Sequence, residues 1–355
     1  MKFHDDAGLW VTGPEPEPVP LTSVLEICGA VLAWTVDDPA GQVRIAFTDP
    51  SRADWLWRIV GANGHSAVVA ALQGAVAGAE VDVPGVGVDP APLSALRHLA
   101  LGHWLRRWWP ASRRDGIAEL DGALLDGELA LLTARAQEFF DDEAFDADVA
   151  GLLRPHAATL SALVRHDDSR VRALAQSCAE LAGDLGLAVV GPAVSVSAGR
   201  RDDYALVAGS AGSKISGAAV AAGVGSINWA AVPSGIFDAA EDTIDWQVES
   251  DGATVNAVVR TDVQGPRSPA GIAVRVRSGR LSGTAALDGS GTAAIPLADG
   301  DGPATDAVAW DHDWSAASVS VGADVTESRL LRDRVRVFAR ARLLEPGDDA
   351  FLAEV

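Results

Sequence analysis

The chain has 355 residues, long enough for two domains, and 48% of them are hydrophobic, which excludes a disordered protein. Lysine and arginine number 28 against 49 aspartates and glutamates, so the formal net charge is -21. This balance argues against nucleic acids and anionic membrane surfaces as partners, because both attract clustered positive charge.

The composition also indicates the compartment. The first residues include His4, Asp5 and Asp6 and lack the basic and apolar regions of a secretory signal. The least polar long run, residues 66–79, is too short and too rich in alanine and glycine to span a bilayer. The two cysteines, Cys28 and Cys178, show no metal-binding spacing and resemble buried small hydrophobic residues. We therefore expect a cytoplasmic protein without a cofactor.

Residues 1–20 are predicted to form an extended arm. Proline and glutamate alternate between Gly13 and Pro20, which favours a solvated, extended backbone over a packed element. Trp10, just before this stretch, is expected to pack on its own domain or on a partner.

Residues 21–88 mix strand and helix signals. Segments 21–34 and 42–48 are predicted strands, and the turn-forming residues between them, Asp-Asp-Pro-Ala-Gly, predict a hairpin. Asp49-Pro50 then favours the start of a helix. An alanine-rich helix over 65–79 and a short extended passage over 81–88 follow.

From Asp89 the apolar residues recur at three- and four-residue steps, which predicts helices. Asp89-Pro90 opens the first, and Pro110 ends it. Further helices are expected over 116–141, 144–164 and 169–186. Residues 21–186 should therefore form an α-rich (α+β) domain.

Residues 187–355 are expected to form an antiparallel β-sandwich or barrel-like domain with a closing helix. Short alternating segments are separated by glycine-rich breaks, and Asp251-Gly252 and Ser278-Gly279 are hairpin signals. The arginine-rich segment 327–344 fits a strand or a helix, and its length favours a helix. The predicted strands are 193–196, 204–207, 214–220, 225–230, 244–248, 255–260, 272–276, 281–286 and 292–297.

The densest polar cluster is Trp310-Asp311-His312-Asp313-Trp314. Asp311, His312 and Asp313 could serve a metal or a general base, and they are the catalytic candidates. If the segment is a strand, alternate residues face opposite sides, so the tryptophans and His312 would share one face. That arrangement favours packing or a recognition surface over a reaction centre.

Other polar motifs are better explained without catalysis. Asp299, Asp301 and Asp306 resemble the start of a calcium loop but lack its closing glutamate, which favours a solvated turn. Asp168 or Ser169 is expected to cap a helix after His166. His98 and His103 are five residues apart, so they do not match the zinc pattern of two histidines four apart. The sequence over 209–214 departs from the phosphate-binding loop pattern.

The chain has eleven tryptophans and one tyrosine, and Trp108 and Trp109 lie between two pairs of arginines, 106–107 and 113–114. Tryptophan and arginine are enriched at protein interfaces, although packing at a helix end also explains the cluster. Stacking on an exposed base is a third explanation, which the negative charge of the chain disfavours. The predicted binding-surface residues are Arg106, Arg107, Trp108, Trp109, Arg113, Trp310 and Trp314.

The sequence thus predicts an α+β protein with an arm (1–20), an α-rich domain (21–186) and an antiparallel β domain (187–355). No set of acid, base and nucleophile is spelled out in one place, so the leading hypothesis is a non-enzymatic binding or assembly (adaptor) protein, with other proteins or a second copy as partner. A metal-assisted hydrolase using Asp311, His312 and Asp313 is the first alternative. Recognition of a small ligand, glycan or peptide by tryptophans of the β domain is the second.

Overall fold

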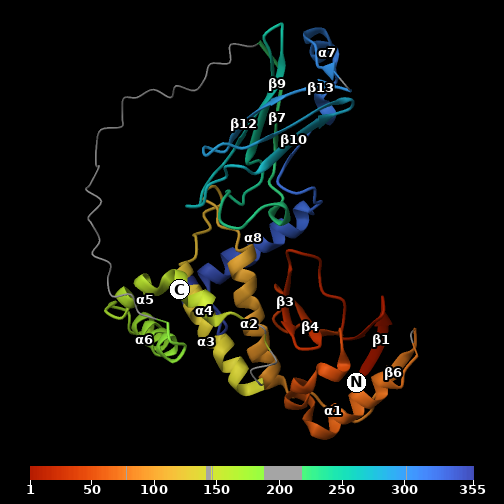
Figure 1. The fold of residues 1–355 in the computed structure, drawn as a ribbon, viewed down its shortest axis with the longest axis vertical. Coiled ribbons are helices and arrows are strands. Elements are labelled where there is room, and N and C mark those ends of the chain that lie inside the picture. The colour runs from red at the N-terminus through yellow and green to blue at the C-terminus, as the bar shows by residue number, and fades with distance from the viewer. Residues whose placement is uncertain (77, 141–144, 146, 188–217, 301) are drawn as a thin grey trace. The chain divides into compact units, whose positions relative to one another are not determined.

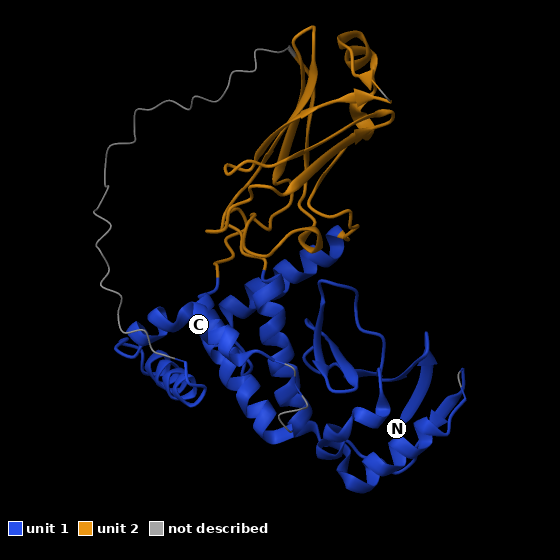
Figure 2. Cartoon of the chain, in the orientation of Figure 1, with its two compact units in different colours: residues 1–109, 120–193, 329–355 blue, residues 110–119, 194–328 orange. Residues whose placement is uncertain are grey.

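The computed structural model describes residues 1–76, 78–140, 145, 147–187, 218–300 and 302–355. The chain forms two compact units (Figure 2). Unit 1 comprises Met1–Trp109, Leu120–Ala193 and Arg329–Val355, and unit 2 comprises Pro110–Glu119 and Val194–Ser328. The units differ from the predicted domains because residues 110–119 belong with the β-rich part and residues 329–355 with the helical part. The periodicity of a sequence predicts its helices and strands. Contacts between distant segments decide which unit each segment belongs to.

Unit 1 contains a six-stranded antiparallel sheet in the order β3-β4-β5-β2-β1-β6. The expected extended arm is wrong for residues 2–12, because they pair within this sheet instead of lying free in solvent. Trp10 is part of that pairing, opposite Phe47. The strands are β1 (Lys2–Asp6), β2 (Leu9–Thr12), β3 (Thr22–Ile27), β4 (Ala30–Thr35), β5 (Arg44–Phe47) and β6 (Glu80–Asp82).

Segment 21–34, predicted as one strand, is a tight hairpin of β3 and β4. Ile27 pairs with Ala30, so Cys28 and Gly29 form the turn. Gly29 has a φ of 76°, and a Cβ there would lie 2.4 Å from the carbonyl oxygen of Asp49. Only glycine meets both requirements without strain. The hairpin predicted across residues 37–41 is confirmed, because β4 pairs with β5 on either side of them.

Helices make up the rest of unit 1 (Figure 1). The side chain of Asp89 accepts a hydrogen bond from the backbone N–H of Ala91, and Asp168 does the same for Arg170, which confirms both predicted helix caps. The helices are α1 (Trp57–Gln73), α2 (Pro90–Trp108), α3 (Gly122–Phe140), α4 (Val149–Leu153), α5 (Ala157–Leu163), α6 (Ser169–Asp184) and α8 (Arg329–Leu344), with short 3₁₀ turns η1 (Pro50–Arg52), η2 (Asp54–Leu56), η4 (Arg154–His156) and η7 (Leu352–Glu354).

Unit 2 is an antiparallel β-sandwich. One sheet has the order β12-β9-β8-β7 and the other β14-β13-β11-β10-β15. Apolar side chains of both sheets share one core, among them Val248 and Val259 from the first sheet and Val274 and Val276 from the second. The strands are β7 (Ala218–Gly225), β8 (Ile244–Ser250), β9 (Val255–Thr261), β10 (Ala273–Ser278), β11 (Leu281–Ala286), β12 (Thr292–Pro296), β13 (Ala298–Asp299), β14 (Gly302–Pro303) and β15 (Ser318–Val321).

Most predicted β elements of this unit are confirmed. Ser250 pairs with Val255 around the Asp251-Gly252 signal, and Ser278 pairs with Leu281 around Gly279. The predicted strand over 225–230 is wrong, since β7 ends at Gly225 and Trp229–Ala231 form the 3₁₀ turn η5. The predicted strands over 193–196 and 204–207, most of the one over 214–220 and the motif over 209–214 lie outside the described residues.

The arginine-rich closing segment forms helix α8, so length was the correct criterion for choosing between strand and helix. The described residues therefore form an α+β protein with a terminal helix, as the sequence predicts.

Candidate interaction surfaces

The segment from Trp310 to Trp314 is not a strand, which corrects the expected facing of its side chains. Trp310 and Asp311 end helix α7 (Asp306–Asp311), and Trp314 begins the 3₁₀ turn η6 (Trp314–Ala316). His312 Nε2 lies 2.8 Å from the Oγ atom of buried Ser278, and the His312 ring packs edge-on against Trp314 at 4.8 Å. These contacts hold the imidazole within the fold.

Of the two neighbouring carboxylates, Asp313 caps a turn and Asp311 is exposed. Asp313 accepts a hydrogen bond from the backbone N–H of Ser315 and so caps η6. Hydrogen bonds from Ser315, first from its backbone and then from its side chain, lower the pKa of Asp313, with a smaller contribution from His312. Asp311 is exposed at the end of α7. The geometry therefore gives Asp313 a capping role and His312 a packing role.

The calcium-loop candidates also have other partners. Asp299 forms an ion pair with Arg280 at 3.0 Å. Asp306 accepts hydrogen bonds from Ser250 Oγ at 2.6 Å and from Trp310 Nε1 at 3.0 Å. Asp301 lies outside the described residues. Among the residues that the structure describes, no group of three or more histidine, cysteine or acidic side chains could hold a metal ion.

The tryptophans of unit 2 do not form an exposed row. Trp229 and Trp246 are each only 8% exposed and belong to the buried interior. Trp314 is half-buried, and its Nε1 donates to the carbonyl oxygen of Ala309 at 2.9 Å. Trp310, at 53%, is the exposed member. A ligand that stacks across several indoles has no platform here.

The predicted aromatic-basic patch is divided between the two units. Arg107 stacks on Trp108, with 4.1 Å between the guanidinium carbon and the ring centre, and Trp109 caps the end of α2. Arg106 instead binds Asp126. Arg113 belongs to unit 2, where its Nη2 donates to the carbonyl oxygen of Gln264 at 3.2 Å. The patch is therefore not one surface of one unit.

Asp126 is a buried carboxylate at the centre of a polar network that was not predicted from the sequence. Its carboxylate, near the start of α3, contacts Arg106 Nε at 2.8 Å and His156 Nε2 at 3.0 Å. Arg106 and His103 line an adjoining cavity of about 490 Å³. Burial, and then Arg106, lower the pKa of His103. An aspartate inside the apolar run of α3 was the available signal, because such a carboxylate needs a partner.

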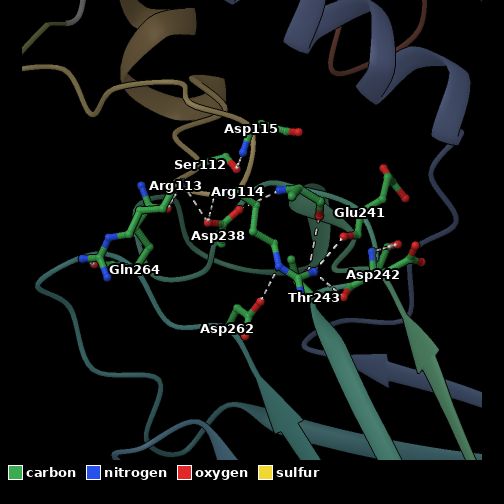
Figure 3. Close-up of polar contacts among 12 residues, drawn as sticks. Ser112, Arg113, Arg114, Asp115, Asp238, Glu241, Asp242, Thr243, Asp262 and Gln264 are labelled. Carbon is green, nitrogen blue, oxygen red and sulfur yellow. Dashed lines mark hydrogen bonds and ion pairs between the residues drawn. The ribbon is translucent and has the colours of Figure 1, made fainter.

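Residues 110–119 are held against the β-sandwich by hydrogen bonds and an ion pair, which we call the latch (Figure 3). The Asp238 carboxylate accepts hydrogen bonds from the backbone N–H groups of Arg113 and Ala240, both at 2.9 Å. The Arg114 side chain reaches Asp262 at 3.1 Å and the carbonyl oxygen of Asp242 at 2.7 Å. This network gives Asp238 and the arginines of the loop a structural role.

Helix α8 buries three of its arginines and exposes three of its large aliphatic residues. Arg332, Arg336 and Arg342 are 5%, 4% and 7% exposed. Leu330, Val337 and Leu344 are 69%, 64% and 81% exposed, and they recur every seven residues, so they lie along one face. We call these three residues the α8 stripe. This surface was not predicted from the sequence.

The packing of α8 within unit 1 explains why arginines are buried and the α8 stripe is exposed. Arg334 binds Asp37, with Nε at 3.0 Å from Oδ2, and Glu17 at 2.8 Å. Arg342 binds Glu354 and Asp349 near the end of the chain. Val335 and Ala339 are fully buried. These contacts fix which side of α8 faces the interior of unit 1. The α8 stripe lies on the other side of the helix.

Comparison with known proteins gives no relative: no family model, no curated protein and no solved structure matches the chain. In the described part of the chain, no helix has the length and apolar character needed to cross a membrane.

Proposed function

We propose that this protein is a binding or assembly protein, and that it pairs with a second copy of itself through the α8 stripe. The supporting observation is the exposure of Leu330, Val337 and Leu344 along one face of a helix that buries three arginines elsewhere. Large aliphatic side chains aligned on one exposed face indicate an interaction site, whereas single exposed ones need no explanation.

The spacing of the stripe suits another helix. Seven residues span two helical turns, the repeat by which helices pack along a common seam. Ala341 is also exposed and lies between Val337 and Leu344 on the same side. Its small side chain leaves room for a neighbouring backbone to approach.

A second α8 is the partner that the stripe fits best. The stripe is symmetric about Val337, with a leucine seven residues away on each side. In an antiparallel pair, Leu330 of each copy would pack on Leu344 of the other, as a two-fold interface requires. Asp333 would then face the region of Arg340 in the other copy, so the flanking charges would be complementary as well. One helix pair is smaller than a standard interface, so we expect a weak dimer.

Cysteine cross-linking tests the pairing and its direction. In a Cys28→Ser background, Val337→Cys is expected to give a disulfide-linked dimer on mild oxidation. Leu330→Cys mixed with Leu344→Cys is expected to cross-link, while either variant alone is not. Cross-linking of Leu330→Cys with itself would show a parallel pair, and absence of cross-linking in all of these samples would overturn the proposal. Val224→Cys, on an exposed part of unit 2, is the control.

We propose that the protein works in the cytoplasm, where Cys28 and Cys178, both free thiols, would stay reduced. The hydrolase alternative requires Asp311, His312 and Asp313 in one site. His312 and Asp313 have the packing and capping partners described above, so we do not carry this alternative forward.

A further inference from the structure

A second candidate site lies within the helical part of unit 1, away from α8. Residues from α4, η4, α5 and α6 enclose a cavity of about 460 Å³. Leu153, Leu160 and Cys178 form its buried part, and Val164 and Ala182 are half-buried in its wall. The Cys178 thiol adds no charge at neutral pH, because burial, followed by the neighbouring Glu128 charge, raises its pKa to about 11. The interior of the cavity is therefore apolar.

The charged residues of the lining are all positive. Arg154 and Arg165 are exposed at the cavity, and no aspartate or glutamate is among the described residues that line it. Within the described residues, neither guanidinium takes part in an ion pair. Ser161 adds a hydroxyl to the same lining. On a chain with a net charge of -21, this local excess of positive charge is a departure from the rest of the surface.

From this combination we propose that the cavity binds an anionic amphiphile, such as a fatty-acid carboxylate. The hydrocarbon chain would occupy the apolar interior, which is the usual character of small-molecule sites. The anionic head group would be held by Arg154 and Arg165, because guanidinium groups bind carboxylate and phosphate oxygens through paired N–H donors. A cationic head group on the same chain would be repelled.

Calorimetric titration of the full-length chain with three twelve-carbon probes tests the proposal. Below their micelle-forming concentrations, dodecanoate is expected to bind at one site, and the dodecyltrimethylammonium cation and dodecanol at least tenfold more weakly. Equal binding of all three probes would show non-specific hydrophobic binding without recognition of the head group, and would overturn the proposal. The absence of dodecanoate binding would also overturn it.

Two variants assign the binding to this cavity. The double substitution Arg154→Gln, Arg165→Gln is expected to weaken dodecanoate binding at least tenfold, while Arg52→Gln, at an exposed arginine outside the cavity, leaves it unchanged. Ala179→Trp is expected to abolish binding by filling the cavity. If the double variant folds, as judged by circular dichroism, and binds dodecanoate like the wild type, the site lies elsewhere and the inference fails.

Discussion

Arg342 and Glu354 form a buried ion pair that ties helix α8 to the end of the chain. Arg342 Nη2 lies 2.6 Å from Glu354 Oε2, and the two side chains are 9% and 0% exposed. Glu354 Oε2 also accepts a hydrogen bond from the backbone N–H of Phe351 at 2.9 Å. Burial alone would lower the pKa of Arg342, but Glu354 and Asp349 more than offset it, so its pKa is raised. The guanidinium therefore stays charged and needs both carboxylates.

Replacing Glu354 is expected to destabilise unit 1. Glu354→Gln removes the charge opposite a buried guanidinium, and breaking a buried pair from one side costs about 3 kcal/mol or more. Chemical unfolding followed by circular dichroism measures the loss. Asp348→Asn, at an exposed neighbouring carboxylate, is the control and should change stability little. Equal stability of Glu354→Gln and the wild type would show that the pair does not hold the chain end.

His98 is expected to make stability depend on pH. Burial lowers its pKa, with Arg342 adding to the effect and Asp349 and Glu354 opposing it. The folded protein therefore keeps His98 neutral, while the unfolded chain binds a proton near its ordinary pKa of about 6.5. Stability should fall as the pH drops below that value. Urea unfolding at pH 7.5 and 5.5 should show a smaller loss for His98→Gln than for the wild type, and equal losses would contradict the assignment.

Cys178 is expected to be inert in the folded protein. Its thiol is buried, and its pKa is raised to about 11, so little thiolate exists at neutral pH. In a Cys28→Ser chain, the remaining thiol should react with a disulfide reagent only after denaturant is added. Rapid reaction at pH 8 without denaturant would mean that this part of the helical unit opens readily.

The latch at Asp238 is expected to protect the loop over 110–119 from proteolysis. Asp238→Ala removes one of the two acceptors of the backbone N–H of Arg113, the other being Gln264 Oε1. The loop should then be cut faster by trypsin after Arg113 or Arg114. Asp245→Ala, an exposed position on β8, serves as the control. The digestion rate, followed by mass spectrometry of the fragments, measures the effect. Unchanged cleavage at these arginines would show that Asp238 does not hold the loop.

Local signals predicted much of the fold. Asp89 and Asp168 cap helices as expected, and Asp251-Gly252 makes the expected turn, because each feature depends on residues a few positions apart. The pairing of residues 2–12 within a sheet could not be predicted in this way. Their partners are as distant as Phe47 and Asp82. The neighbouring residues in the sequence do not indicate which distant strand a segment pairs with, or in which register.

The candidate surfaces were harder to predict than the fold. Asp126 and His156 are 30 positions apart in the chain, so their contact depends on how the helices pack. The outward face of α8 is set by Arg334 and Arg342, whose partners Asp37 and Glu354 lie in other segments. A hydrophobic pattern alone assigns leucine to the interior, and here the buried arginines reverse that assignment.

Sedimentation velocity over a range of protein concentrations tests self-association through α8 most directly. The wild type is expected to shift from monomer to dimer as its concentration rises, and Val337→Glu to stay monomeric, because it places a charge at the centre of the α8 stripe. Val224→Glu, at a valine of similar exposure on β7 (60% against 64%), should dimerise like the wild type. A wild-type chain that is monomeric at every concentration, or a Val337→Glu chain that dimerises as well as Val224→Glu, would contradict the account.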